Sequence, residues 1–225
     1  AQEAAQGMKE LAAAGMKPDQ VMKAIAGTLD LAAAGEMEVA AASEIVSNGL
    51  NMFGMSADKA GHFADVLAKA GALGSLSVQD MGNSLKYVGP VAAAAGWSLE
   101  SVSGALVALS NNGIKGEQGG TVLRGVLTKL VAPSKEASKM MQGMGFSVVD
   151  SAGKMKSLSK IVDEFNAKSA NMTESQRLAA VTTLVGTTNM AGFLALLKTG
   201  GAALDKYTND LIGADGAAKA MAAIK

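Results

Sequence analysis

The sequence AAAGMKPDQ at residues 12–20 shares its pattern with MFGMSADKA at 52–60 and AAAGWSLES at 93–101. In each stretch a run of helix-forming residues reaches a glycine, then an apolar residue, then a small or polar one. A glycine in this place takes the left-handed conformation that closes a helix, and the apolar residue folds back on the last turn. Serine, or proline after lysine, is well suited to start the next helix. The three stretches therefore predict short helices joined by one kind of tight turn.

The glycines of these turns are Gly15, Gly54 and Gly96, which lie 39 and 42 residues apart. Because this spacing is only roughly regular, we interpret it as recurrent turn chemistry and not as a solenoid repeat. Between the turns, apolar residues recur at the three- and four-residue steps of an amphipathic helix. Such steps occur in five segments, at 21–29, 63–70, 102–109, 123–130 and 158–165, and again at Leu178, Val181, Leu184 and Val185. The many alanines between them allow helices to approach closely.

One segment departs from the helical pattern. FSVVDSAGKMKS at 146–157 places Phe146, Val148 and Val149 before a glycine-containing turn and Met155 after it, which is typical of a short β-hairpin. We therefore predict an all-α fold, a multi-helix globular bundle of short antiparallel helices with one small β-hairpin near 146–157. The expected organisation is a multi-helix body at 1–145, then the hairpin with C-terminal helices packed on that body at 146–213. Residues 214–225 are expected to form an Ala-rich tail or the start of a longer helix.

Composition excludes several classes of function. The 225 residues include 20 Lys and Arg, 20 Asp and Glu, one His and no Cys. No disulfide or thiol chemistry is possible, and a single His excludes multi-His metal sites. Zero formal charge and 4% aromatic residues argue against a phosphate-binding groove and against stacking platforms. The longest weakly polar run, 88–97, is shorter than the roughly 18–20 residues that span a bilayer. We expect no cofactor, no metal, no specific nucleic-acid binding and no transmembrane segment.

The glycine-rich segment GIKGEQGGT at 113–121 is the most conspicuous candidate for ligand binding. A phosphate-binding loop needs GxxxxGK followed by Ser or Thr after a strand, but here Lys115 comes too early and no strand precedes it. We interpret the segment as a tight turn between helices. Glu174-Ser175 resembles the acid of some peptidoglycan-cleaving transglycosylases, without their other motifs. Thr173 and Gln176 are better placed as the capping box of a helix in which Glu174 is a first-turn acid.

Four further residues are weighed as sites and given structural roles. Asp163 and Glu164 are adjacent on a helix and point about 100° apart, so we expect a solvated face. His62 has no nucleophile that the sequence can pair with it and is expected to be buried or half-buried. Trp97 is expected to plug a helix end. Three cations in the stretch KGEQGGTVLRGVLTK do not predict a groove for phosphates: Lys115, Arg124 and Lys129. We therefore predict no catalytic, cofactor-binding or metal-ligating residue, and we predict that the chain is not an enzyme.

The order of several motifs closely resembles the core region of phage tail tape measure proteins of the TP901 type. The most distinctive pieces are Phe53-Gly54 with Asp65-Val66-Leu67, the run Lys86 to Pro90, and Gly113-Ile114-Lys115-Gly116 with Thr121-x-Leu123-Arg124. The resemblance covers residues 8–200. The sequence departs from the family at Gly119, where Ala is more frequent, and around Val185-Gly186-Thr187, which lacks the usual Phe-Gly pair.

This resemblance implies a structural virion protein of a phage or prophage that occupies the tail tube lumen, sets tail length and is ejected during DNA delivery. It implies self-association, as a trimer or hexamer, and contacts with the tail tube protein, tail assembly chaperones and tail tip or baseplate proteins. The implied location is the virion tail, with the host bacterial cytoplasm during assembly. Two alternatives stay open from the residues alone: a peptidoglycan-active protein, and a helical adaptor or toxin-delivery module.

Overall fold

The structure is a computed structural model that describes residues 2–224. Residues 1 and 225, the ends of the expected body and tail, lie outside the described residues. The described chain is all-α, as predicted. In chain order its elements are α1 (Gln2–Ala13), α2 (Pro18–Gly35), α3 (Val39–Met52), the 3₁₀ helix η1 (Ala57–Lys59), α4 (Ala60–Leu73), α5 (Val78–Ala94), α6 (Leu99–Asn111), α7 (Gly116–Val131), α8 (Lys135–Met144), α9 (Leu158–Lys168), α10 (Glu174–Val185), α11 (Thr187–Thr199), α12 (Gly201–Ile212) and α13 (Ala217–Ile224).

The three recurrent turns have the geometry that the sequence predicts. Gly15, Gly54 and Gly96 are left-handed, with φ of 92°, 61° and 79°. At the first turn the amide of Met16 donates to the carbonyl of Leu11 at 3.2 Å. This bond encloses six residues and closes the end of the helix. The equivalent amides of Met55 and Trp97 make the same bond, to Leu50 and Ala92. The prediction of helix closure at a glycine is therefore confirmed in all three places.

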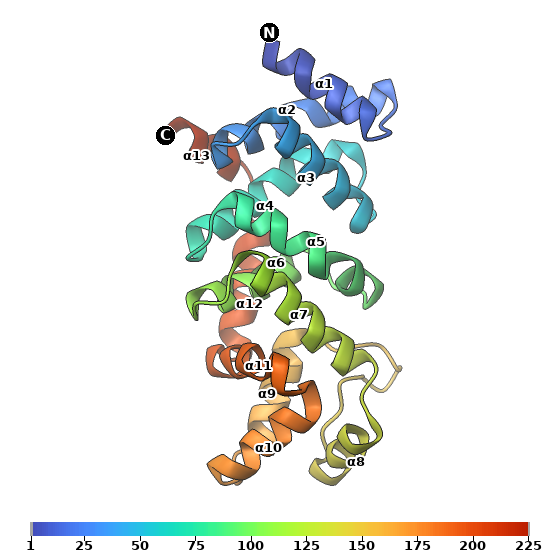
Figure 1. The fold of residues 1–225 in the computed structure, drawn as a ribbon, viewed down its shortest axis with the longest axis vertical. Coiled ribbons are helices and arrows are strands. Elements are labelled where there is room, and N and C mark those ends of the chain that lie inside the picture. Colours follow the sequence, from blue (N-terminus) through green and yellow to red (C-terminus); the bar gives the residue numbers. More distant parts are fainter. Residues whose placement is uncertain (1, 225) are drawn as a thin grey trace.

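Three helix pairs, α2–α3, α4–α5 and α6–α7, follow one another along the long axis of the molecule (Figure 1). Helices α2, α4 and α6 pack on one another in one layer, and α3, α5 and α7 in a second. Each pair packs mainly on the next pair, so the result is an elongated stack and not the globular bundle that we expected. The turns thus mark a unit that repeats in space, which our interpretation as local turn chemistry did not include.

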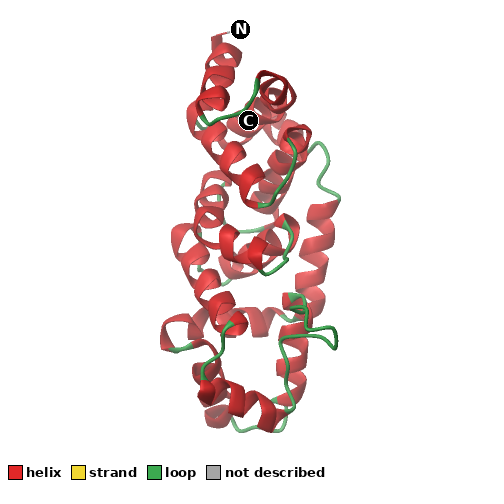
Figure 2. Ribbon diagram, turned by 90° about the vertical axis from the view of Figure 1, so that its right-hand side faces the viewer, coloured by secondary structure: helices red, strands yellow, loops and turns green. Residues whose placement is uncertain are grey.

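The C-terminal part of the chain runs back along this stack. Helices α8 and α10 lie at the end far from the N-terminus, whereas α12 lies along the long axis and packs on α4, α6 and α9 (Figures 1 and 2). Helix α13 then packs on α2 and α4, which brings the C-terminal helix to the same end as α1. Segments at opposite ends of the sequence therefore lie side by side.

Close helix crossings surround a central buried helix. Every residue of α6 from 102 to 110 is buried, because α4, α5, α7, α11 and α12 all pack on it. A methyl group on Gly120 of α7 would lie 2.8 Å from the Cα of Ser84 in α5, and the side-chain-free glycine lets the two backbones meet. Lower in the stack, Phe165 packs edge-on against Phe146 and Phe193, with ring centroids 5.6 Å apart in both pairs.

The predicted β-hairpin at 146–157 does not form. Within residues 2–224 the only sheet-like pairing is one isolated antiparallel bridge, between Val149 and Met155. The turn itself is present, since Gly153 is left-handed and the Asp150 carboxylate accepts the amides of Ala152 and Lys154, both at 2.9 Å. Two backbone hydrogen bonds join the arms, from the Asp150 amide to the Lys154 carbonyl at 2.8 Å and from the Lys156 amide to the Val148 carbonyl at 2.9 Å. Among the described residues no further strand extends this pairing, so the local pattern yields a turn with a single bridge and no strand.

Candidate functional site

The glycine-rich segment at 113–121 serves helix packing. Gly113 closes α6 with φ of 85°, and α7 begins at Gly116, so Gly119 and Gly120 lie inside a helix and are buried. The Ser84 hydroxyl of α5 donates to the carbonyl of Gly116 at 2.6 Å and ties the start of α7 to its neighbour. The turn that we predicted is therefore limited to residues 113–115, and Gly120 allows the close α5–α7 crossing.

Glu174 has the position expected of a capping-turn residue. The side chain of Thr173 accepts the amide of Gln176 at 3.3 Å, and the Gln176 side chain accepts the amide of Thr173 at 3.0 Å. This reciprocal pair is the predicted capping box. Glu174 is exposed in the first turn of α10, where a carboxylate is favourable near the positive end of the helix. The stripe predicted for this helix is corrected at Leu178, which is 42% exposed.

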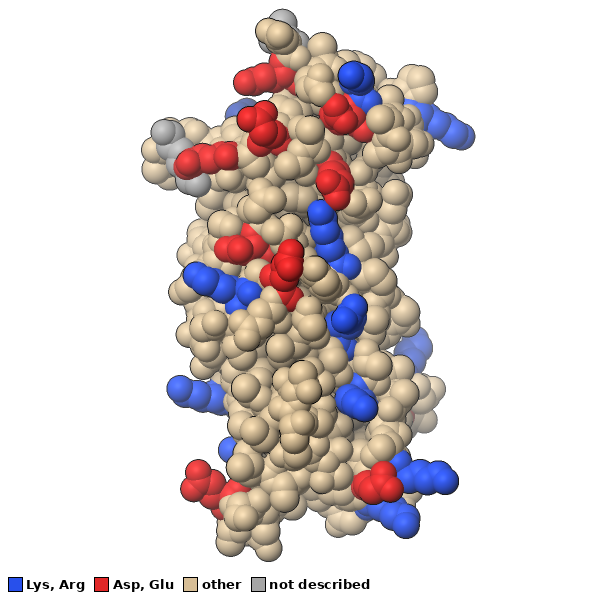
Figure 3. Space-filling model, viewed as in Figure 1, with Lys and Arg blue, Asp and Glu red and all other residues tan. Residues whose placement is uncertain are grey.

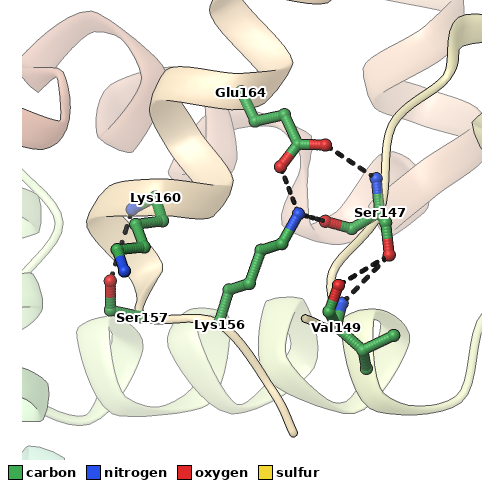
Figure 4. Close-up of polar contacts among 6 residues, drawn as sticks. All are labelled: Ser147, Val149, Lys156, Ser157, Lys160 and Glu164. Atoms are coloured by element: carbon green, nitrogen blue, oxygen red, sulfur yellow. Dashed lines mark hydrogen bonds and ion pairs between the residues drawn. The ribbon is translucent and has the colours of Figure 1, made fainter. Parts of the chain in front are cut away.

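Asp163 is exposed, as predicted for a solvated face, and Glu164 is half-buried, but each carboxylate also binds another segment of the chain. Asp163 accepts the amide of Gly201 at 2.7 Å and so caps the start of α12. Glu164 accepts the amide of Ser147 at 3.1 Å and forms an ion pair with Lys156. Figure 4 shows Lys156 between Glu164 and the Ser147 carbonyl, to which its ammonium donates at 2.8 Å. The cluster anchors the turn at 147–156 onto α9.

The ionisation of Glu164 reflects this anchoring role. Partial burial raises its pKa, but the bonds from Lys156 and from the Ser147 amide lower it further than burial raises it. The pKa of Glu164 therefore lies below its ordinary value of 4.5. A carboxylate held in its charged form by two donors keeps the turn attached across the neutral pH range.

His62 is half-buried, as predicted, and contacts two acids from other elements. Its Nε2 lies 2.8 Å from Glu100 Oε1 in α6, and its Nδ1 lies 3.7 Å from Asp215 Oδ1 in the α12–α13 linker. Burial raises the pKa of Glu100, and the hydrogen bonds from His62, the backbone and Ser98 lower it to a net value below 4.5. Asp65, one turn further along α4, accepts the amides of Gly216 and Ala218 at 2.8 and 2.9 Å. Sequence analysis missed Asp65 in this role, since no local signal relates residues 150 positions apart.

Trp97 is buried at the start of α6, 6% exposed, as expected of a plug at a helix end. Its indole Nε1–H is buried without a hydrogen-bond partner among the described residues. A cavity of about 330 Å³ lies beside it, between the starts of α6 and α9 and one side of α12. Its rim carries hydroxyl groups and one carboxylate, from Ser98, Ser101, Ser157, Thr208 and Asp205. In the described part of the chain no group of three acidic or His side chains could hold a metal ion.

Charges on the surface are mostly dispersed. On the face in Figure 3, most acidic side chains lie over the upper helices with some basic ones among them, basic side chains lie singly over the middle, and both signs occur at the lower end. Arg124 lies over the Tyr87 ring, 6.0 Å from its centroid, whereas Lys115 and Lys129 are near opposite ends of α7, about 20 Å apart along the helix. No single helix within residues 2–224 is long and apolar enough to span a membrane. Helices α10 and α11 reach the required length and hydropathy only when taken together, and they are bent by 117° relative to each other.

Most candidate residues therefore close a helix, cap one or tie two segments together, whereas Glu174 and Lys129 are simply exposed. These features are typical of a helical structural scaffold. The chain matches the family described as phage-related minor tail protein over residues 1–186. It is 43% identical over 222 residues, 99% of the chain, to the "Tape measure protein" of Pneumococcus phage Dp-1. It is 30% identical over 157 residues, 70% of the chain, to the "Probable tape measure protein" of Escherichia phage P2.

The chain belongs to the family of phage-related minor tail proteins. The resemblance to tape measure proteins is confirmed across nearly its whole length. The chain spans 19% of the length of each of these two relatives. No solved structure matches it.

Proposed function

We propose that the chain is a folded region of a phage tail tape measure protein, a structural component of the virion tail. One observation carries the proposal, the 43% identity with a tape measure protein over 99% of the chain. In this role the whole protein occupies the tail tube lumen, sets tail length and is ejected during DNA delivery. Its partners are further copies of itself, the tail tube protein, tail assembly chaperones and tail tip or baseplate proteins, first met in the host cytoplasm.

The shape of the stack bears on how such a protein would measure length. A continuous helix advances about 1.5 Å per residue. In this chain the helices cross the long axis and the C-terminal part runs back along it, so the same residues cover much less distance (Figure 1). We therefore place the measuring in other parts of the protein, and propose that this region is a compact body within the longer molecule.

An in-frame duplication of this region in the phage gene tests both statements. If residues 2–224 act as a compact body, electron microscopy of purified tails will show much less lengthening than the roughly 330 Å that 223 helical residues would add. Duplicating an equally long helical segment from another part of the gene is the matched control and should give the full increment. The proposed role fails if mass spectrometry does not detect the protein in purified tails.

Passage through the tail tube suggests a second test of the proposed role. Zero formal charge and a surface with many small side chains suit a protein that slides out of a tube. Replacing exposed alanines of α1, such as Ala5 and Ala12, by arginine should lower infectivity while tails of normal length still assemble. Unchanged infectivity of such phages would count against ejection of this region.

The peptidoglycan-active alternative is tested directly on the purified chain. Glu174 is exposed in a capping turn, so we expect no clearing of a murein zymogram by the native chain or by Glu174→Gln. Clearing by the native chain that the substitution abolishes would replace the structural role by an enzymatic one. The adaptor alternative is tested by gene order, since a tape measure gene should lie among genes for the tail tube and baseplate.

A further inference from the structure

The last helix of the structure is attached to the stack through its first turn. Asp65 of α4 accepts the amide of Gly216 at 2.8 Å and that of Ala218 at 2.9 Å, with one carboxylate oxygen for each. These amides belong to the first turn of α13 and have no partner within that helix. A carboxylate here also faces the positive end of the helix dipole. Asp65 thus acts as an N-cap supplied by a distant segment of the chain.

A second contact on α4 holds the linker that precedes α13. His62 lies one turn before Asp65, and its Nδ1 is 3.7 Å from the Asp215 carboxylate. The opposite ring nitrogen of His62 is held by Glu100 at 2.8 Å, which fixes the direction of the ring. Asp215 itself is 91% exposed, so this contact is weak and readily exchanged with water. Polar contacts from a single helix therefore surround the point where α13 begins.

Helix α13 packs on α2 and α4 mainly through small side chains. Ala218 is buried, Ala217 and Met221 are partly buried, and Ile224 at the other end is 87% exposed. Helix α12 is different, because it buries Leu204 and Leu211 and meets α6 closely at Gly104. Alanine buries little surface, and apolar stabilisation follows the area buried. The docking of α13 therefore depends on the Asp65 carboxylate to a degree that the docking of α12 does not.

We propose that residues 213–224 form a detachable latch, which Asp65 holds closed over α2 and α4. Opening breaks the two hydrogen bonds that the backbone amides of Gly216 and Ala218 donate to Asp65. It frees the face of α2 and α4 that α13 covers, while the stack from α1 to α12 stays folded. The latch is a release point at one end of the molecule, and it does not depend on the proposed role in a phage tail.

Hydrogen exchange of the whole chain tests the latch. Asp65→Asn keeps the shape of the side chain and removes the charge that accepts both amides. We expect exchange of the amides in 216–224 to become roughly tenfold faster or more, because charge-assisted hydrogen bonds are among the stronger ones. Exchange in α4, α6 and α12 should stay unchanged, and so should the urea midpoint for unfolding of the stack.

Asp163→Asn is the matched control, because Asp163 also caps a helix from a distance, at Gly201 of the buried helix α12. This variant should lower the urea midpoint and should not accelerate α13 selectively. The latch is refuted if Asp65→Asn leaves exchange in 216–224 unchanged, or if it accelerates the whole stack in parallel and lowers the midpoint as Asp163→Asn does. A chain that stops after residue 213 gives a second test. An unchanged urea midpoint for unfolding of the stack supports the latch, and a large decrease in that midpoint contradicts it.

Discussion

Gly120→Ala should destabilise the protein although alanine is the better helix former. The added methyl would lie 2.8 Å from the Ser84 Cα and 2.9 Å from its carbonyl carbon, and closer still to the carbonyl oxygen. Ordinary contact begins near 3.4 Å, and the methyl would lie 2.3 Å from the Ser84 carbonyl oxygen, so α5 and α7 must separate by about 1 Å at this point. The Ser84 hydroxyl bonds the Gly116 carbonyl at 2.6 Å across the same crossing, and this bond would stretch or break.

Three contributions to the free energy of unfolding can be compared for Gly120→Ala. Overpacking against backbone costs about 1–3 kcal/mol, loss of the buried hydrogen bond costs about 1 kcal/mol, and helix propensity returns about 1 kcal/mol. The net loss is about 2 kcal/mol, which lowers Tm by about 4–8 °C in a chain of this size. Gly61→Ala in α4 is the control, because its methyl would meet nothing within 4 Å, and it should gain about 0.5–1 kcal/mol. Urea and thermal unfolding followed by circular dichroism measure both. The close-crossing argument is wrong if Gly120→Ala is as stable as the native chain.

Four further substitutions test turns, buried hydroxyls and acid sensitivity. Gly96→Ala keeps open space but forces φ of 79° on alanine, so thermal unfolding should show a loss of about 1–2 kcal/mol. Ser103→Ala removes a buried hydroxyl that has no partner among the described residues and should be neutral or stabilising, whereas Ser84→Ala should lose about 1 kcal/mol in urea titrations. The folded pKa of Glu100 lies below 4.5, so its contribution is present above that pH and lost as pH falls through the folded pKa. Glu100→Gln should therefore be less stable than the native chain near neutral pH, and urea titrations should show this gap closing as the pH falls below 4.5.

Local chemistry accounts for the features that the sequence predicted correctly. A helix end at Gly54 or Gly96 is set by neighbours within six residues, and the capping box of Thr173 and Gln176 by neighbours within three. The end of α2 shows where such rules stop. Gly35 looks like the closing residue, but it remains helical beside Val78, and Glu36 takes the left-handed conformation with φ of 50°. A Cβ at Gly35 would meet the Met37 side chain and, at 3.3 Å, Val78 of α5, and the second contact joins distant segments that the local sequence does not relate.

Distant contacts account for what the sequence did not predict. The return of α13 to α4 rests on Asp65, and the anchoring of the 147–156 turn rests on Glu164, which looked like a solvated acid. Each of these carboxylates binds backbone amides from another segment, and a single sequence contains no signal for that pairing. The prediction of a β-hairpin was wrong because it also depends on contacts with a distant segment. Its local pattern is sound, but a ladder also needs a partner strand, and the residues next to it in space are helical.

Glycine has two opposite roles in this chain, and their combination explains why an elongated stack forms. At Gly54 and Gly96 it ends a helix, because the residue that follows is apolar and folds back on the helix end. At Gly27 and Gly120 it continues a helix and brings it against the backbone of a neighbour, at Ala60 and Ser84 respectively. The first role sets the length of each helix, and the second sets how closely successive pairs stack. Because the crossings lie between α2 and α4 and between α5 and α7, each pair is bound to the next along one axis, and the chain extends as a stack instead of closing into a bundle.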